Sequence, residues 1–153
     1  MRTLSNVGER AARQGRLIGA AGAAVLLLSL FIPWYTVDFP PGNAFAVNGW
    51  EVFRRLDVAL AVLAGLALVT SFVRPRLIGI DVFVPTLIAA RFILGAVGCV
   101  LVVDKLVNLP LIQGEVAPTF GAYLGLAACM TVTLSAVLDW TRKPTRPRAE
   151  ALP

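Results

Sequence analysis

The sequence contains no histidine and only two cysteines, and charged side chains make up only 15% of its 153 residues. The absence of histidine removes the commonest general base and metal ligand of proteins. Cys99 and Cys129, with no histidine or acid beside them, make a poor zinc site. We also find no serine–histidine pair, glycine-rich phosphate loop or paired-carboxylate arrangement. These absences predict a protein that is not an enzyme and that binds no metal or cofactor.

Hydrophobic residues make up 58% of the chain. They form four blocks, 17–33, 58–73, 83–103 and 120–138, and most of the charges fall between them. Each block approaches the roughly 20 residues that a helix needs to cross about 30 Å of hydrocarbon. A soluble domain would carry about 25% charged residues, and barrel strands would alternate apolar and polar residues. The sequence therefore predicts an all-α integral membrane protein, a bundle of four transmembrane helices that forms one domain over residues 1–140.

Basic residues flank these blocks unequally. Most lie before the first block, between the second and third, and after the fourth, whereas the other two connections hold only Arg54, Arg55 and Lys105. The positive-inside rule then predicts that both termini and the 74–82 connection are cytoplasmic in a multi-pass protein of the cell membrane. The proline-rich basic tail, 141–153, is expected to be disordered. Because the charge follows the topology, we expect membrane lipids and not nucleic acid as partners.

The segment FIPWYTVDFPPGNAF follows the first block and changes character abruptly. Trp34 and Tyr35 are expected to mark the membrane–water interface, where amphipathic rings are favoured, and Trp50 lies on the same outer side. Alternating residues on either side of Pro-Gly-Asn predict a short outer β-hairpin between the first two helices, with an irregular loop as the alternative. Asn48 and Glu51 match a capping box, so a helix should begin near position 49.

Two charged residues are candidates for a role beyond topology. Asp57 would join Arg54 in a charged collar at the outer interface, either as a solvated helix end or as a binding site. Arg91 lies inside the third block, where an arginine costs roughly 2.5–3.5 kcal/mol at a helix centre. It either extends to the cytoplasmic interface and pairs with Asp139, or serves an ion pathway or a lipid headgroup.

Small residues recur at spacings that let helix backbones approach closely, as in 19–24 and at Gly121 and Gly125. Such faces pack either within one bundle or against another chain. Four helices can bury only some of these faces on each other. We therefore expect a homo-oligomer or a larger membrane complex.

Three stretches, SLFIPWY, WEVFRRLDVALAVLAG and FGAYLGLAA, carry a resemblance to a known family. The chain from Ser29 to Trp140 resembles small uncharacterised four-helix membrane proteins of high-GC actinobacteria. The matching motifs are Pro33-Trp34-Tyr35, Trp50, Asp57 and the run 121–125. The preference for arginine over lysine fits such a genome. The resemblance implies a four-helix topology and a bacterial inner membrane, and it implies no activity.

The residues leave three functions open. The first is a structural, accessory or self-assembling membrane subunit that acts through helix packing and outer loops. The second is a small transporter or channel, although Thr131, Thr133 and Ser135 cannot share one helix face. The third is a lipid-binding protein that uses Arg91 and the cytoplasmic basic residues.

Overall fold

The structure is a computed structural model that describes residues 2–39, 42–52, 54–73, 83–109 and 115–141. The predicted tail, apart from Thr141, and the whole 74–82 connection with its two arginines lie outside these residues. The described chain is mostly helical, with four long helices, one short helix and a small three-stranded sheet.

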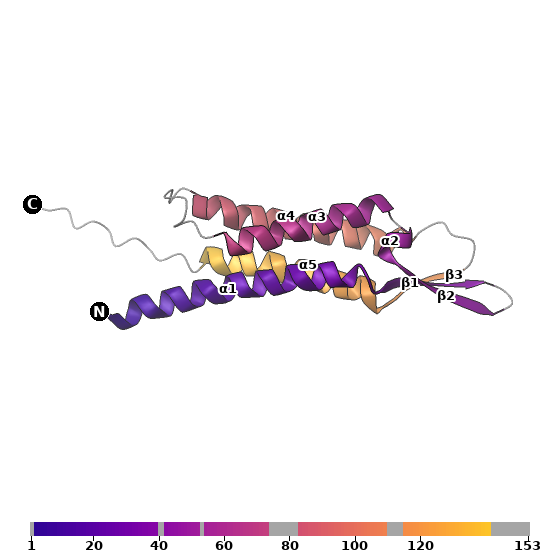
Figure 1. The fold of residues 1–153 in the computed structure, drawn as a ribbon, viewed down its shortest axis with the longest axis horizontal. Coiled ribbons are helices and arrows are strands. Elements are labelled where there is room, and N and C mark those ends of the chain that lie inside the picture. Colours follow the sequence, from indigo (N-terminus) through magenta and orange to yellow (C-terminus); the bar gives the residue numbers. More distant parts are fainter. Residues whose placement is uncertain (1, 40–41, 53, 74–82, 110–114, 142–153) are drawn as a thin grey trace, which may run out of the picture.

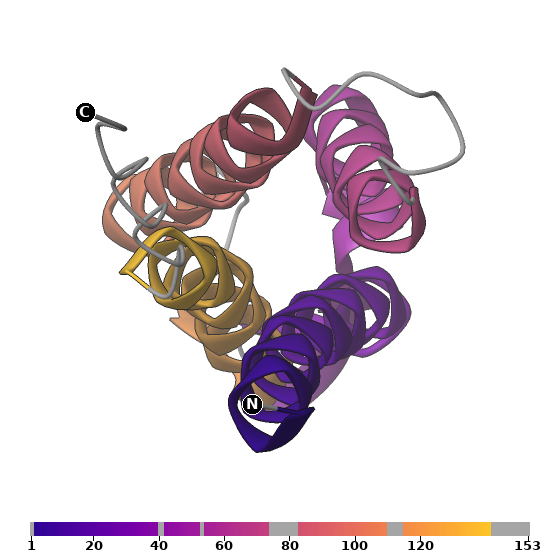
Figure 2. The same cartoon turned by 90° about the vertical axis from the view of Figure 1, so that its left-hand side faces the viewer.

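The four long helices lie side by side as a bundle (Figure 1). They are α1 (Arg2–Ser29), α3 (Arg54–Phe72), α4 (Phe83–Val107) and α5 (Phe120–Thr141). Viewed down the bundle, each helix contacts the next in chain order, and α5 returns to α1 (Figure 2). Because consecutive helices run in opposite directions, α1 begins and α5 ends at the same end of the bundle. The sheet lies at the other end, which we call the sheet end.

Three of these helices are long and apolar enough to cross a membrane: Arg55–Phe72, Pro85–Val107 and Phe120–Thr141. Their outward faces expose large apolar side chains such as Leu66, Val100 and Leu134, as lipid-facing helices do. These findings agree with three of the four predicted spans. The fourth predicted span, at the start of the chain, stays a prediction, because the first half of α1 carries several arginines.

Helix α1 ends at Ser29, four residues before the proline that closes the first apolar block. The chain then makes a turn in which the amide of Ile32 donates to the carbonyl oxygen of Ser29 at 3.2 Å. The indole Nε1–H of Trp34 donates to the same carbonyl at 2.8 Å. Carbonyls in the last turn of a helix lack intrahelical partners, so these two bonds account for one of them.

The predicted hairpin is present as β1 (Pro33–Phe39) and β2 (Asn43–Asn48), which pair in antiparallel fashion. Gly42 has a φ of 101°, a left-handed conformation that suits glycine in the connecting turn. A third strand, β3 (Glu115–Pro118), was not predicted and pairs with the other side of β1, giving the order β2-β1-β3. The two connections at this end therefore form one sheet.

The predicted capping box is also present, at the start of the short helix α2 (Gly49–Val52). The amide of Glu51 donates to Asn48 Oδ1 at 3.1 Å, and the amide of Asn48 donates to Glu51 Oε2 at 3.2 Å. Helix α3 follows almost at once, so the sheet leads directly into the second long helix.

The main core lies toward the sheet end and is built around Leu30, Trp34, Tyr35, Leu60 and Val102, all fully buried. A smaller cluster of Ala23, Ala67 and Val132 lies deeper in the bundle. Small residues dominate this deeper cluster, which lets the helices approach each other closely.

Glycines on α5 make room for the main core. A Cβ atom at Gly121 would clash with the carbonyl oxygen of Pro33, and one at Gly125 would lie 3.0 Å from Cζ2 of Trp34. By contrast, nothing lies within 4 Å of a Cβ atom at Gly65. The faces that contain Gly121 and Gly125 are thus used for packing within one chain.

We expect Gly121→Ala to lower the free energy of unfolding by about 1–3 kcal/mol, because the added methyl group overpacks a filled site. The matched control, Gly65→Ala, should raise it by up to about 1 kcal/mol, because alanine favours helix and the site is open. Unfolding by a denaturing detergent in mixed micelles would measure both. Equal effects of the two substitutions would contradict this packing.

Candidate functional site

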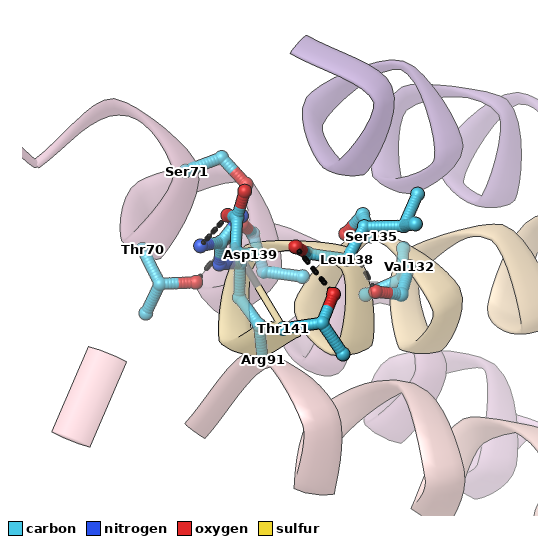
Figure 3. Close-up of polar contacts among 9 residues, drawn as sticks. Thr70, Ser71, Arg91, Val132, Ser135, Leu138, Asp139 and Thr141 are labelled. Carbon is cyan, nitrogen blue, oxygen red and sulfur yellow. Dashed lines mark hydrogen bonds and ion pairs between the residues drawn. The ribbon is translucent and has the colours of Figure 1, made fainter. Parts of the chain in front are cut away.

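At the end opposite the sheet, Arg91 of α4 and Asp139 of α5 form a buried ion pair (Figure 3). Arg91 Nη2 donates to Asp139 Oδ2 at 2.6 Å, and the two side chains are only 3% and 7% exposed. This is the pairing that the structural interpretation of Arg91 required. It joins α4 to α5 and leaves the two charges neutral as a pair.

Helix α1 completes this site with residues that have no side chain. A Cβ atom at Gly15 would clash with Asp139, and one at Gly19 would lie 2.6 Å from Ser135 Oγ and 3.4 Å from Arg91 Nη1. Gly22 continues the same face, against Thr131. The glycines at 15, 19 and 22 therefore face the α5 residues 139, 135 and 131, and α1 packs directly over the ion pair.

One hydrogen bond joins the pair, and several of its other polar atoms lack partners. Within the described chain, Arg91 Nε, Arg91 Nη1 and Asp139 Oδ1 have no hydrogen-bond partner. Buried polar atoms without partners are rare in proteins. An arginine stays protonated in proteins, so the pair can hold helices together or contact a polar group, but Arg91 cannot act as a general base.

At the sheet end, Trp34 and Tyr35 are both fully buried. Both rings are therefore surrounded by protein, and their predicted place at the membrane–water interface stays a prediction. Strand β1 turns back over the bundle, so Trp34 packs on the glycines of α5, and the hydroxyl of Tyr35 donates to the carbonyl oxygen of Lys105 at 2.9 Å. Burial and the nearby carboxyl groups of Asp57 and Asp104 raise the pKa of Tyr35 to about 12.

Asp57 is also fully buried, which contradicts the prediction of a solvated helix end. The buried positions of α3 are 57, 60, 64, 67 and 71, which follow a helical spacing along one inward face. Asp57 occupies the first position of that face, whereas Arg55 is exposed. Neither carboxyl oxygen of Asp57 has a hydrogen-bond partner among the described residues.

Trp50 is partly buried against the main core, and its ring lies 6.0 Å from that of Phe31, centroid to centroid. Its indole Nε1 is buried without a partner in the described part of the chain. Trp50 thus belongs to the same end of the bundle as Trp34, Tyr35 and Asp57, while Arg91 and Asp139 lie at the other end.

An apolar layer separates the two groups. Its residues line a small cavity with room for about one water molecule, and they come from all four long helices: Leu26, Leu63, Ala64, Ala67, Leu94, Gly95, Cys129 and Val132. Cys99 and Cys129 are free thiols. Among the residues that the structure describes, no three histidine, cysteine, aspartate or glutamate side chains are grouped as a metal site would need.

Sequence reasoning missed Gly15 and Ser135 as neighbours of the ion pair. A signal for them existed, because glycines at 15, 19 and 22 and polar residues at 131, 135 and 139 both recur at intervals of one helical turn. The sequence alone does not show that the glycines of α1 face these polar residues of α5.

Comparison of this chain with known family models, with curated protein sequences and with solved structures gives no match. The family resemblance drawn from the sequence motifs stays a prediction, and the function has to be argued from the geometry alone.

The ion pair should behave as one unit in a double-mutant cycle. Arg91→Met or Asp139→Asn alone leaves a buried charge unpaired and should cost about 3–5 kcal/mol of unfolding free energy. The double variant should cost less than the sum, with a coupling of about 1 kcal/mol or more.

The matched control is the pair Lys105–Asp104, at 3.0 Å and with side chains 25% and 45% exposed. Its cycle, with Lys105→Met and Asp104→Asn, should give a coupling below about 1 kcal/mol, because solvent screens an exposed pair. Strictly additive costs at Arg91 and Asp139 would show that the pair does not hold α4 to α5.

Proposed function

We propose that this chain is a non-enzymatic multi-pass membrane protein that acts as an accessory or self-assembling subunit, and that it assembles through the β2 edge of its sheet. The observation that carries the proposal is the composition of β2. This strand has six residues, Asn43–Asn48, without a charge or a proline, and positions 43–46 are exposed. In the described sheet its only neighbour is β1.

The opposite edge of the sheet is built differently. Strand β3 has only four residues, begins with the charged Glu115 and ends with Pro118, which has no amide hydrogen to donate. Proteins protect their sheet edges with short strands, charges and prolines. Because β3 has all three features and β2 has none, β2 is the edge suited to receive another strand.

The membrane placement supports the same function. Helix α1 packs along α3 and α5, so its apolar half, 17–29, lies beside two helices that can cross a membrane. We therefore infer four spans, with both termini in the cytoplasm of a bacterial inner membrane and the sheet on the outer side. A sheet in that position can meet the outer segment of a second membrane protein.

The helix faces that contain glycines give less support to assembly with a second chain than the sequence alone suggested. Gly19, Gly22, Gly121 and Gly125 all contact other elements of this chain, so association through those glycines would compete with the fold. A homo-oligomer or a larger complex remains our expectation, with the contact at β2 in place of the helices.

The two alternative functions find less support. A transporter needs a polar path between the two ends, and the layer between Asp57 and Arg91 is lined by apolar or small residues. A lipid site at Arg91 needs an uncompensated charge, and Asp139 already neutralises it. Membrane lipids then surround the bundle without a specific binding site at Arg91.

The test compares one substitution at the two edges of the sheet. Ala46 and Ala117 both lie opposite Thr36 on β1, so they share one face of the sheet, and both are exposed. Ala46→Lys should weaken assembly by roughly tenfold, or ~1.4 kcal/mol, by placing a charge on the pairing edge. Ala117→Lys should leave assembly unchanged.

Native mass spectrometry of protein extracted from its own membranes would follow the fraction that is heavier than the 16.3 kDa chain. The proposal fails if the wild type is a monomer without a bound protein. It also fails if Ala46→Lys and Ala117→Lys weaken assembly equally.

A further inference from the structure

The side chain of Asp57 is the least explained group in the bundle. It is 0% exposed, and both of its carboxyl oxygens lack a hydrogen-bond partner within the described chain. An ionised carboxylate that is removed from water needs a counter-charge or several donors, because its desolvation is otherwise very costly. A buried carboxyl group without such partners is more stable with a proton attached.

Among the charged side chains that the structure describes, which do not include that of Arg54, none forms a hydrogen bond with Asp57. On its own helix, Arg55 is exposed. On α4, Lys105 pairs with its neighbour Asp104 at 3.0 Å. On β1, Tyr35 contributes a phenol whose hydroxyl already donates to the carbonyl oxygen of Lys105.

The remaining elements at this end add no cation. The half of α1 that reaches the sheet end, 17–29, and the stretch of α5 from 120 to 138 carry no charged side chain. Glu51 of α2 and Glu115 of β3 are acidic and exposed. The described surroundings of Asp57 thus include no cation hydrogen-bonded to it, and burial favours the protonated carboxyl group over the free carboxylate.

We propose that Asp57 is a proton-binding site at the sheet end of the bundle. When it is protonated, the carboxyl group of Asp57 is compatible with the observed packing of β1, α3 and α4 around Tyr35. Without the proton, a negative charge appears inside the core, close to Tyr35. The hydrogen bond from the hydroxyl of Tyr35 to the carbonyl oxygen of Lys105, which joins β1 to α4, then lies beside the ionised carboxylate of Asp57. This inference does not depend on the assembly edge of β2.

Infrared spectroscopy of the protein in nanodiscs at pH 5 tests the proposal directly. A protonated carboxyl group gives a C=O stretching band that is separate from the bands of carboxylates. We expect this band in the wild type and its loss in Asp57→Asn, which keeps the shape of the side chain. The matched control, Asp104→Asn, removes an exposed carboxylate at the same end and should keep the band.

A second measurement needs no variant. A hydrophobic carbodiimide adds to a protonated carboxyl group, whose proton moves to a nitrogen of the reagent, and the adduct rearranges to a stable N-acylurea. Peptide mass spectrometry should find this adduct on Asp57 and not on Asp139, which is paired with Arg91. Labelling should fall by roughly tenfold or more once the pH passes the point at which the site loses its proton.

Absence of the protonated band from the wild type at pH 5 would overturn the proposal. So would a band that persists in Asp57→Asn. If the band appears only after sodium ions are replaced by choline, the site holds a metal cation and the proton assignment is wrong. If Asp57→Asn does not accumulate, the wild-type band together with the position of the adduct decides the question.

Discussion

The close approach of α1 to α5 is the constraint on which the rest of the structure depends. On α1, the absent side chains of Gly15 and Gly19 admit Asp139 and Ser135, and on α5 those of Gly121 and Gly125 admit Trp34. Between lipid-exposed helices there is little hydrophobic driving force, so close packing of backbones has to hold the bundle together. The glycines thus fix both ends of one helix pair, and α3 and α4 pack around it.

This arrangement divides the polar groups between the two ends. The ion pair of Arg91 and Asp139 is covered by α1 at one end, whereas Asp57 is covered by β1 and its tyrosine at the other. The middle is apolar and contains a small cavity. A molecule of this kind is suited to holding a fixed shape in the membrane and presenting a surface outside it. The surface available for that purpose is the sheet, whose β2 edge lacks the usual protection.

The sequence predicted the elements that depend on local pattern. The apolar blocks predicted the four long helices, three of which are apolar enough to cross a membrane. Alternation around a turn predicted the hairpin, and Asn48 with Glu51 predicted the start of α2. It did not predict β3, because Glu115–Pro118 is short and its partner strand lies far away in the chain. It also misplaced the contacts of Trp34, Tyr35 and Asp57. Position in a block indicates depth in the membrane, but only the fold of β1 decides whether a side chain faces lipid or protein.

The measurement that tests the account most directly is the accessibility of the two ends of α1. Single cysteines at Asn43, exposed in β2, and at Gln14, exposed before the apolar half of α1, can be treated in intact cells with a membrane-impermeant maleimide. If α1 crosses the membrane beside α5, Asn43→Cys reacts in intact cells and Gln14→Cys reacts only after the membrane is opened. Reaction of both positions from the same side of the membrane would contradict the four-span bundle.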